Sequence, residues 1–254
     1  MLLAVDVGNT QTHVGAFDGA DLIGDWRLAT RGDSTADELA LAIAGSLQFR
    51  DLDRAAVTGL ILSTVVPRLA PEYERLCARH LSAPFLPVGP AARTGMPILI
   101  DNPHELGSDR LVNAVSAFAK VGGRCLSVDF GTSINVDAVS AEGEYLGGII
   151  APGLEVSIDA LSSRAAKLPR FQLTRPERAI GRNTQTALQS GFAYGFAGLV
   201  DGVVGRMRDE LGEDATVIAT GGMATTIAPL CGAIDEVDPY LTLTGLRLIW
   251  ERNR

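Results

Sequence analysis

The chain has 254 residues, of which 46% are apolar and 20% charged, so it can bury a sizeable core and is too apolar to be disordered. Its 22 basic and 30 acidic side chains give a formal charge of −8, and no run of lysine or arginine forms a stripe along which a phosphate backbone would bind. We therefore expect no nucleic-acid partner, and an anionic ligand must be held locally by backbone N–H groups, one or two arginines or a bound metal.

The amino terminus and the cysteines indicate the cellular compartment. Met1–Val5 lacks a basic flank and is too short for a signal peptide, and the later apolar runs fall short of the ~20 residues of a membrane helix. Cys77, Cys125 and Cys231 are far apart, odd in number and form no CxxC pair, so neither a disulfide framework nor a cysteine zinc site is indicated. We expect a soluble cytoplasmic protein without a membrane partner.

Hydrophobic periodicity predicts alternating strands and helices in the first half of the chain, which is the order of an α/β lobe. The predicted elements are a hairpin with arms at 14–17 and 22–28 turning at Asp18-Gly19, a helix over about 35–48 opened by a capping box of Ser34 and Asp37, a strand at 60–62, a helix after Pro67 carrying Leu69, Tyr73, Leu76 and His80, and a helix within 105–121.

The second half repeats the start of the first. A shift of 123 residues aligns Val5–Thr10 with Val128–Ser133, and an apolar hairpin follows each copy. Two equivalent lobes are the simplest explanation, and chance similarity of two strand ends is the alternative. We place the boundary near residue 120, before Gly122-Gly123, which gives lobes 1–120 and 121–254.

The remaining elements of the second lobe include a long helix with an unusual glycine pattern. The glycines recur every three or four residues, so they would lie along one side of the helix and permit a close helix crossing. The predicted elements are a hairpin with arms at 136–139 and 145–150 turning at Glu142-Gly143, the long helix from Thr184 with Gly191, Gly195, Gly198, Gly202 and Gly205, a strand at 216–219, a turn at Gly221-Gly222 and a closing helix at 243–250.

Each aligned turn combines a carboxylate with backbone N–H groups. Asp6–Thr10 and Asp129–Thr132 both place an aspartate at a strand end before a glycine turn. The carboxylate suits a hard cation and the N–H groups suit phosphate oxygens. One such turn is weak evidence, because Asp and Gly are common turn formers. Two at equivalent places indicate a triphosphate held in the cleft between two lobes, as in an ATP-dependent kinase.

A possible acid–base group lies at the start of the helix within 105–121. Gly107, Ser108, Asp109 and Arg110 should occupy its first turn. Asp109 is a candidate proton acceptor, and Arg110 can pair with a carboxylate or phosphate. The spacing fits equally well an aspartate that only stabilises the positive end of the helix, with a solvated arginine beside it.

Two further glycine-rich segments leave room for a ligand. Gly147–Gly153 and Ala219–Gly222 each join predicted elements, and ordinary turns explain them almost as well. The chain contains no GxxxxGK[ST] and no GxGxxG motif, so the sequence supports neither a P-loop nor a dinucleotide-binding fold.

Taken together, these segments resemble the type III pantothenate kinases, a family in the superfamily of actin, hexokinase and the sugar kinases. The resemblance covers essentially the whole chain, and several motifs in the right order are far more specific than any one. The motifs are Asp6–Thr10, Ser63–Pro67, Asn102-Pro103 leading to Gly107–Arg110, Asp129–Thr132, Gly147–Gly153, Asn183-Thr184 and Ala219–Gly222.

The resemblance implies two ribonuclease-H-like lobes with the active site in the cleft between them, a homodimer, and transfer of the ATP γ-phosphate to the terminal hydroxyl of pantothenate. It implies Asp109 as the proton acceptor, Asp129 as a ligand of a monovalent cation, K⁺ or NH₄⁺, and Mg²⁺ bound with ATP, which we assign to Asp6. The implied ATP contacts are Asp6, Val7, Gly8, Asn9, Thr10, Gln11, Thr12, His13 and Thr132, and the implied pantothenate contacts are Gly107, Ser108, Asp109, Arg110 and Thr184.

The chain departs from the family pattern at two places. The second turn continues Ser133-Ile134-Asn135-Val136-Asp137 where the family commonly has Ala-Thr-Thr-Phe-Asp, and Ile100 stands where a tyrosine is frequent. Two alternatives stay open: a nucleotide-binding regulatory protein with little turnover, which the altered segment Ser133–Val136 motivates, and an ATPase or phosphatase of the same superfamily. An assay of ADP release with and without pantothenate separates the three.

Overall fold

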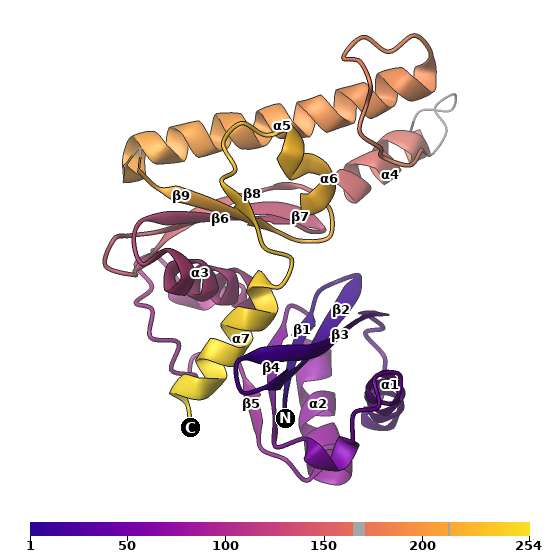
Figure 1. Cartoon of the computed structure of the whole chain (residues 1–254), viewed down its shortest axis with the longest axis vertical. Helices are drawn as coiled ribbons and strands as arrows, with labels where there is room; N and C mark the ends of the chain where they lie inside the picture. Colours follow the sequence, from indigo (N-terminus) through magenta and orange to yellow (C-terminus); the bar gives the residue numbers. More distant parts are fainter. Residues whose placement is uncertain (165–170, 213) are drawn as a thin grey trace. The chain divides into compact units, whose positions relative to one another are not determined.

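The computed structural model describes residues 1–164, 171–212 and 214–254, which form two compact units (Figure 1). The first unit comprises Met1–Gly95, Asn102–Ser116 and Leu241–Arg254, and the second comprises Met96–Asp101 and Ala117–Tyr240. Each contains one five-stranded mixed sheet, so the predicted α/β class is confirmed. The division into lobes 1–120 and 121–254 stays a proposal. The compact units do not follow a single boundary, since the last helix belongs to the first unit.

The sheet of the first unit has the strand order β3-β2-β1-β4-β5. β1, β2 and β3 are antiparallel neighbours, whereas β4 and β5 run parallel to β1. The predicted hairpin, first helix and following strand are confirmed. The elements are β1 (Leu2–Val7), β2 (Gln11–Asp18), β3 (Asp21–Ala29), α1 (Ala36–Gln48), β4 (Gly59–Thr64), α2 (Ala70–Leu76), β5 (Phe85–Pro87) and α7 (Leu241–Arg252).

The two faces of this sheet are covered by different helices. Leu3, Val5 and Val7 lie on the face that forms a core with α1 and α2. On the opposite face α7 packs against β1, β2 and β4. It approaches so closely that a Cβ atom at Gly59 would lie 2.1 Å from the ring of Trp250. On β1 this second face carries Leu2 and Ala4 and becomes polar at Asp6, near the carboxyl end of the strand.

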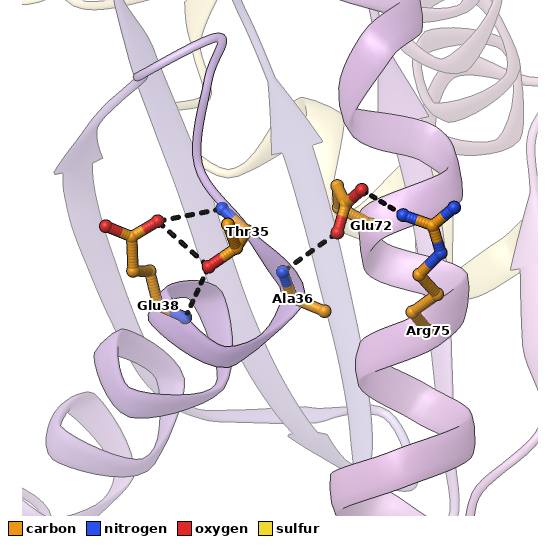
Figure 2. A network of polar contacts seen from close by, with 5 residues as sticks. All are labelled: Thr35, Ala36, Glu38, Glu72 and Arg75. Atoms are coloured by element: carbon orange, nitrogen blue, oxygen red, sulfur yellow. Dashed lines mark hydrogen bonds and ion pairs between the residues drawn. The ribbon is translucent and has the colours of Figure 1, made fainter.

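The first turn of α1 shows a capping box one residue later than the sequence predicts. Thr35, not Ser34, is the N-cap: its hydroxyl accepts from the Glu38 N–H at 3.3 Å, and Glu38 accepts from the Thr35 N–H at 2.8 Å. Figure 2 shows this network, in which Glu72 also accepts from the Ala36 N–H at 3.0 Å. Both Ser34 and Thr35 have the hydroxyl that a cap needs, so residue type alone did not decide between them.

Thr35→Ala is therefore expected to lower the free energy of unfolding by about 1 kcal/mol, because it removes the hydroxyl that caps α1. Ser34→Ala is the matched control and should leave stability within roughly 0.3 kcal/mol, since surface substitutions away from such features have small effects. Urea unfolding of the two variants measures both values. Equal losses would contradict the cap position.

The sheet of the second unit has the order β10-β9-β6-β7-β8. Its core joins Leu126, Val128 and Phe130 of β6 to the buried stripe of α5, which includes Val200 and Val204. The predicted second hairpin, the long helix from Thr184, the strand at 216–219 and the closing helix are confirmed. The remaining elements are α3 (Ser108–Val121), β6 (Cys125–Phe130), β7 (Ser133–Val139), β8 (Tyr145–Pro152), α4 (Leu154–Arg164), α5 (Thr184–Leu211), β9 (Thr216–Thr220), α6 (Ala224–Ile227) and β10 (Glu236–Val237).

The glycines of α5 meet no other helix among the described residues of this chain, so the close helix crossing that the sequence predicts stays a prediction. In the described part of the chain, no atom outside the backbone of α5 lies within 4 Å of a Cβ placed at Gly191, Gly195, Gly198 or Gly205. These glycines are exposed, whereas the buried stripe of α5 runs through Ser190 and residues at helical spacing from it. The spacing predicts a glycine side of the helix, but it does not say which surface meets that side. No helix among the described residues is long and apolar enough to span a membrane.

Candidate functional site

The first predicted phosphate turn joins β1 to β2. Asp6 lies near the end of β1, and the Gly8 N–H donates to the Gln11 carbonyl oxygen at 3.0 Å, which closes the turn. The end of β3 supports it: the Thr30 N–H donates to the Thr10 carbonyl oxygen at 2.9 Å. Asn9 and Thr10 are exposed at the tip, so a ligand can reach their backbone.

Four polar side chains line up across this sheet beside the turn. Asp6 lies directly opposite Ser63 on β4 and His13 on β2, and His13 lies directly opposite Arg27 on β3. Directly opposite residues point to the same face of a sheet, so Ser63, Asp6, His13 and Arg27 form one row, which we call the polar row. It lies on the face that α7 covers further along the strands.

The start of α3 packs against the polar row. The hydroxyl oxygens of Ser63 and Ser108 are 3.0 Å apart, and the Thr64 N–H donates to the Ser108 hydroxyl at 3.1 Å. Asp109 is the next residue and lies in the first turn of α3, as the sequence predicts. The structure therefore brings Asp6 and Gly107–Arg110 together within the first unit.

Asp6 and Asp109 both have raised pKa values. Burial and, after it, the nearby charge of Asp109 raise the pKa of Asp6 to about 7, against the opposing effects of a hydrogen bond from Ser63 and the charge of Arg27. Burial also raises the pKa of Asp109, while the N–H and the charge of Arg110 oppose that increase. A buried carboxyl group whose ionisation is disfavoured by a second one nearby is characteristic of a site that binds a cation or transfers a proton.

The second predicted turn joins β6 to β7 and is one residue shorter than the first. Here the Gly131 N–H donates to the Ser133 carbonyl oxygen at 3.0 Å, two residues ahead, whereas the Gly8 N–H bonds three residues ahead. In the first turn Asp6 lies opposite His13, which the 123-residue shift aligns with residue 136. Because the second turn is shorter, Asp129 lies opposite Asn135 instead. The two turns are related, but they differ in length by one residue.

Two glycines from distant segments pack against the second turn. A Cβ atom at Gly153 would lie 2.2 Å from the Thr132 carbonyl oxygen, and one at Gly221 would lie 2.4 Å from Asp129 Oδ1. Gly221 also has a φ of +95°, a conformation that glycine adopts without strain. The glycine-rich segments that the sequence singled out therefore surround Asp129 and Thr132, in the second unit.

The departures from the family pattern lie on different faces of β7. Ile134 is fully buried in the core of the second unit, so it faces away from Asp129. Asn135 lies beside Asp129 and accepts a hydrogen bond from the Ser133 hydroxyl at 3.2 Å. Of the two positions where a threonine of the family is replaced, only Asn135 therefore faces the second turn. Ile100 lies in the second unit near Gly147 of β8.

Thr184 lies at the start of α5, apart from the other predicted substrate contacts in sequence and in compact unit. Asn183 caps the helix by accepting from the Thr186 N–H at 2.8 Å. Thr184 lines an open groove of about 780 Å³ together with apolar side chains of α5, among them Phe192 and Phe196. The groove is large enough for a small molecule or a side chain of another protein.

The described residues contain no group of three or more His, Cys, Asp or Glu side chains that could hold a metal ion.

Sequence reasoning had named Asp6, Asp109 and Asp129 correctly as the carboxylates at the ends of these elements. It had not named Arg27 or Asp25, because their relation to His13 depends on strand register. The alternation of polar residues in 21–29 is the only signal that could have identified them.

The family model described as type III pantothenate kinase matches residues 2–206. A protein named type III pantothenate kinase from an Anaeromyxobacter species is 50% identical over 254 residues, covering 100% of both chains. One of the same name from Acidothermus cellulolyticus is 50% identical over 255 residues, covering 100% of this chain and 99% of its own.

Solved structures show the same fold at low sequence identity. A Campylobacter jejuni protein described as a Baf family transcriptional activator is 20% identical with a TM-score of 0.61, covering 99% of this chain and 98% of its own. A Porphyromonas gingivalis protein described as an N-acetylglucosamine kinase is 12% identical with a TM-score of 0.54, covering 100% and 99%. These likenesses show that the chain shares its fold with both solved structures.

Proposed function

The chain belongs to the type III pantothenate kinase family, and from this we propose which of its residues carry the reaction. It is an ATP-dependent kinase that phosphorylates pantothenate in coenzyme A biosynthesis. Our assignment rests on the position of Asp109. It follows Ser108, whose hydroxyl lies 3.0 Å from that of Ser63 in the polar row. The charge of Asp109 raises the pKa of the partly exposed Asp6 in addition to the effect of burial.

In this proposal Asp109 accepts the proton of the terminal hydroxyl of pantothenate while that oxygen attacks the γ-phosphorus of ATP. The raised pKa of Asp109 makes its carboxylate a better proton acceptor than an exposed one. Gly107, Ser108 and Arg110 contact pantothenate near the reacting hydroxyl. Asp109 and Arg110 are adjacent in the first turn of α3, so a base and a cationic group act side by side.

The phosphates are assigned to the two turns. Asp6–His13 forms the first phosphate loop, with Asp6 as the residue that would hold Mg²⁺ with ATP, and Thr132 contacts ATP from the second turn. Thr184 is assigned to pantothenate. Mg²⁺ bound at Asp6 would neutralise charge on the phosphate oxygens. The position of the active site in a cleft between the two lobes stays part of this proposal.

Asp129 is assigned to a monovalent cation, K⁺ or NH₄⁺. A single carboxylate, with Gly131 and Gly221 close to it, suits a monovalent ion better than a divalent one, which prefers several carboxylates. We expect turnover to fall about tenfold when Na⁺ replaces K⁺ at constant ionic strength, equivalent to roughly 1.4 kcal/mol in the barrier.

The measurement is a coupled assay of ADP release with ATP and Mg²⁺, in K⁺ or Na⁺, with and without pantothenate. Asp129→Asn should abolish the difference between the two cations, and Glu142→Gln, in the exposed turn between β7 and β8, is the control that should retain it. Equal rates in K⁺ and Na⁺ for the wild type would remove Asp129 from this role. Pantothenate-independent ADP release would indicate hydrolysis instead.

We also propose that the protein is a homodimer and that α5 forms part of the interface. The glycines of α5 leave its backbone open to close approach, and the groove beside them is lined by half-buried Phe192, Phe196 and Leu199. An apolar surface of this kind is typical of contacts between protein chains. The free thiols Cys77, Cys125 and Cys231 support a cytoplasmic location, where thiols stay reduced.

Gly198→Arg is expected to convert the dimer to a monomer, because a long charged side chain would occupy the space left open beside α5. Gly45→Arg is the matched control: Gly45 is also a helical glycine with open space around its Cβ position, but it lies on α1. Sedimentation velocity of the wild type and both variants measures the mass. A dimeric Gly198→Arg variant would place the interface elsewhere.

A further inference from the structure

Arg27 occupies one end of the polar row and has no role in the reaction as assigned so far. It lies on β3, directly opposite His13, which in turn lies directly opposite Asp6. Two strand spacings, roughly 10 Å, therefore separate the Cα atoms of Arg27 and Asp6. A long arginine side chain pointing to the same face can reach an anion that is bound above Asp6.

The hydrogen bonds around Arg27 leave its guanidinium available. Asp25, two residues earlier on the same face of β3, uses its carboxylate to bind His13, with 3.1 Å between Asp25 Oδ2 and His13 Nε2. His13 is buried and Arg27 is exposed. Within residues 1–164, 171–212 and 214–254, Arg27 forms no hydrogen bond or ion pair through its side chain, although its charge acts on Asp6 and His13.

The second unit has an equivalent row without a positive charge. There Asp129 lies opposite Thr220 and Asn135, and Asn135 lies opposite Ile150. Ile150 is 67% exposed, so the corresponding edge position carries an apolar side chain that is open to solvent. The sheet geometry alone therefore does not require a basic residue at this position, and the arginine is specific to the first turn.

The overall charge of −8 disfavours the approach of a triphosphate, so positive groups near the phosphates have a large local effect. We propose that Arg27 donates hydrogen bonds to the γ-phosphate of ATP bound at the Asp6–Thr10 turn, and that the Asp25–His13 hydrogen bond positions the row beneath it. The inference rests on the proposed role of that turn as the phosphate loop. An arginine stabilises the charge on the equatorial oxygens of a phosphoryl group during transfer.

Arg27→Gln tests this role. We expect kcat to fall about 10²- to 10³-fold, the range for losing one donor to a transition-state oxyanion, with the KM for pantothenate unchanged. Binding of the non-hydrolysable analogue AMPPNP should weaken by a larger factor than binding of ADP, because only AMPPNP has a γ-phosphate. Arg27→Lys should recover part of both losses. Arg50→Gln, an exposed arginine after α1, is the control and should behave as wild type.

Titration calorimetry with the two nucleotides and the melting temperature distinguish a phosphate contact from a structural role. Equal weakening of AMPPNP and ADP, or wild-type kinetics, would overturn the proposal for Arg27, as would a kcat loss accompanied by an equal loss in Arg50→Gln. Asp6→Asn tests the underlying assignment separately: if it retains wild-type kcat and nucleotide affinity, the phosphate loop itself is misassigned, whatever Arg27→Gln shows.

Discussion

Asp109→Asn is expected to lower kcat by about 10²- to 10⁴-fold, the range that a general base contributes. Asparagine has nearly the same shape as aspartate, so the first turn of α3 and the contact between Ser108 and Ser63 should persist. What the variant loses is the carboxylate that accepts the proton. Nucleotide affinity should stay within about threefold, because binding needs no proton transfer.

The competing explanation is that Asp109 only stabilises the positive end of α3. Asp37→Asn is the matched control, since Asp37 lies in the first turn of α1 and has no place in the site. Loss of such a helix-terminal charge costs roughly 0.3–1 kcal/mol of stability and should leave turnover unchanged. Steady-state kinetics and thermal melting of both variants give the result. If Asp109→Asn turns over like the wild type, Asp109 is not the proton acceptor.

Gly221→Ala has the largest expected effect on the second unit. A Cβ atom at this position would lie 2.4 Å from Asp129 Oδ1 and 2.7 Å from the Phe130 backbone nitrogen, and the φ of +95° is strained for alanine. We expect a loss of about 2–4 kcal/mol in the free energy of unfolding, together with loss of activation by K⁺, because the Asp129 carboxylate must move.

The neighbouring glycine provides the control. Gly222→Ala meets no atom within 4 Å and has no positive φ, so the same methyl group added one residue later should change stability and activity little. Urea unfolding and the K⁺ dependence of ADP release compare the two variants. A stable, K⁺-activated Gly221→Ala protein would show that the turn after β9 can move away from Asp129 without consequence.

Local periodicity was sufficient to predict most of the elements. The apolar spacing at 39, 43 and 47 predicted α1, and the two hairpins followed from alternation around glycine turns. The cap of α1 was misplaced by one residue, since two neighbouring hydroxyl residues satisfied the same pattern. α4 (Leu154–Arg164) was not predicted, because its apolar residues give only a weak stripe.

The site was predictable where it depends on residues adjacent in sequence. Asp6, Asp109 and Asp129 each stand beside a glycine or a helix start that gives them a recognisable local pattern. The polar row was not predictable, because a one-residue change of register would turn Arg27 to the other face of the sheet. The packing of Gly221 on Asp129 also joins segments about 90 residues apart, which no local pattern reports.

The return of α7 to the first sheet has a consequence for biosynthesis. Gly15 and Gly59 are covered by Leu243 and Trp250, which are translated only after residues 117–240. At about 5–20 residues per second, that interval lasts on the order of ten seconds on the ribosome. During this time the nascent first unit exposes the apolar strip of its sheet that includes Leu2, Ala4 and Ile61. The fold therefore requires a period of protection from aggregation, which ends only when the last helix emerges.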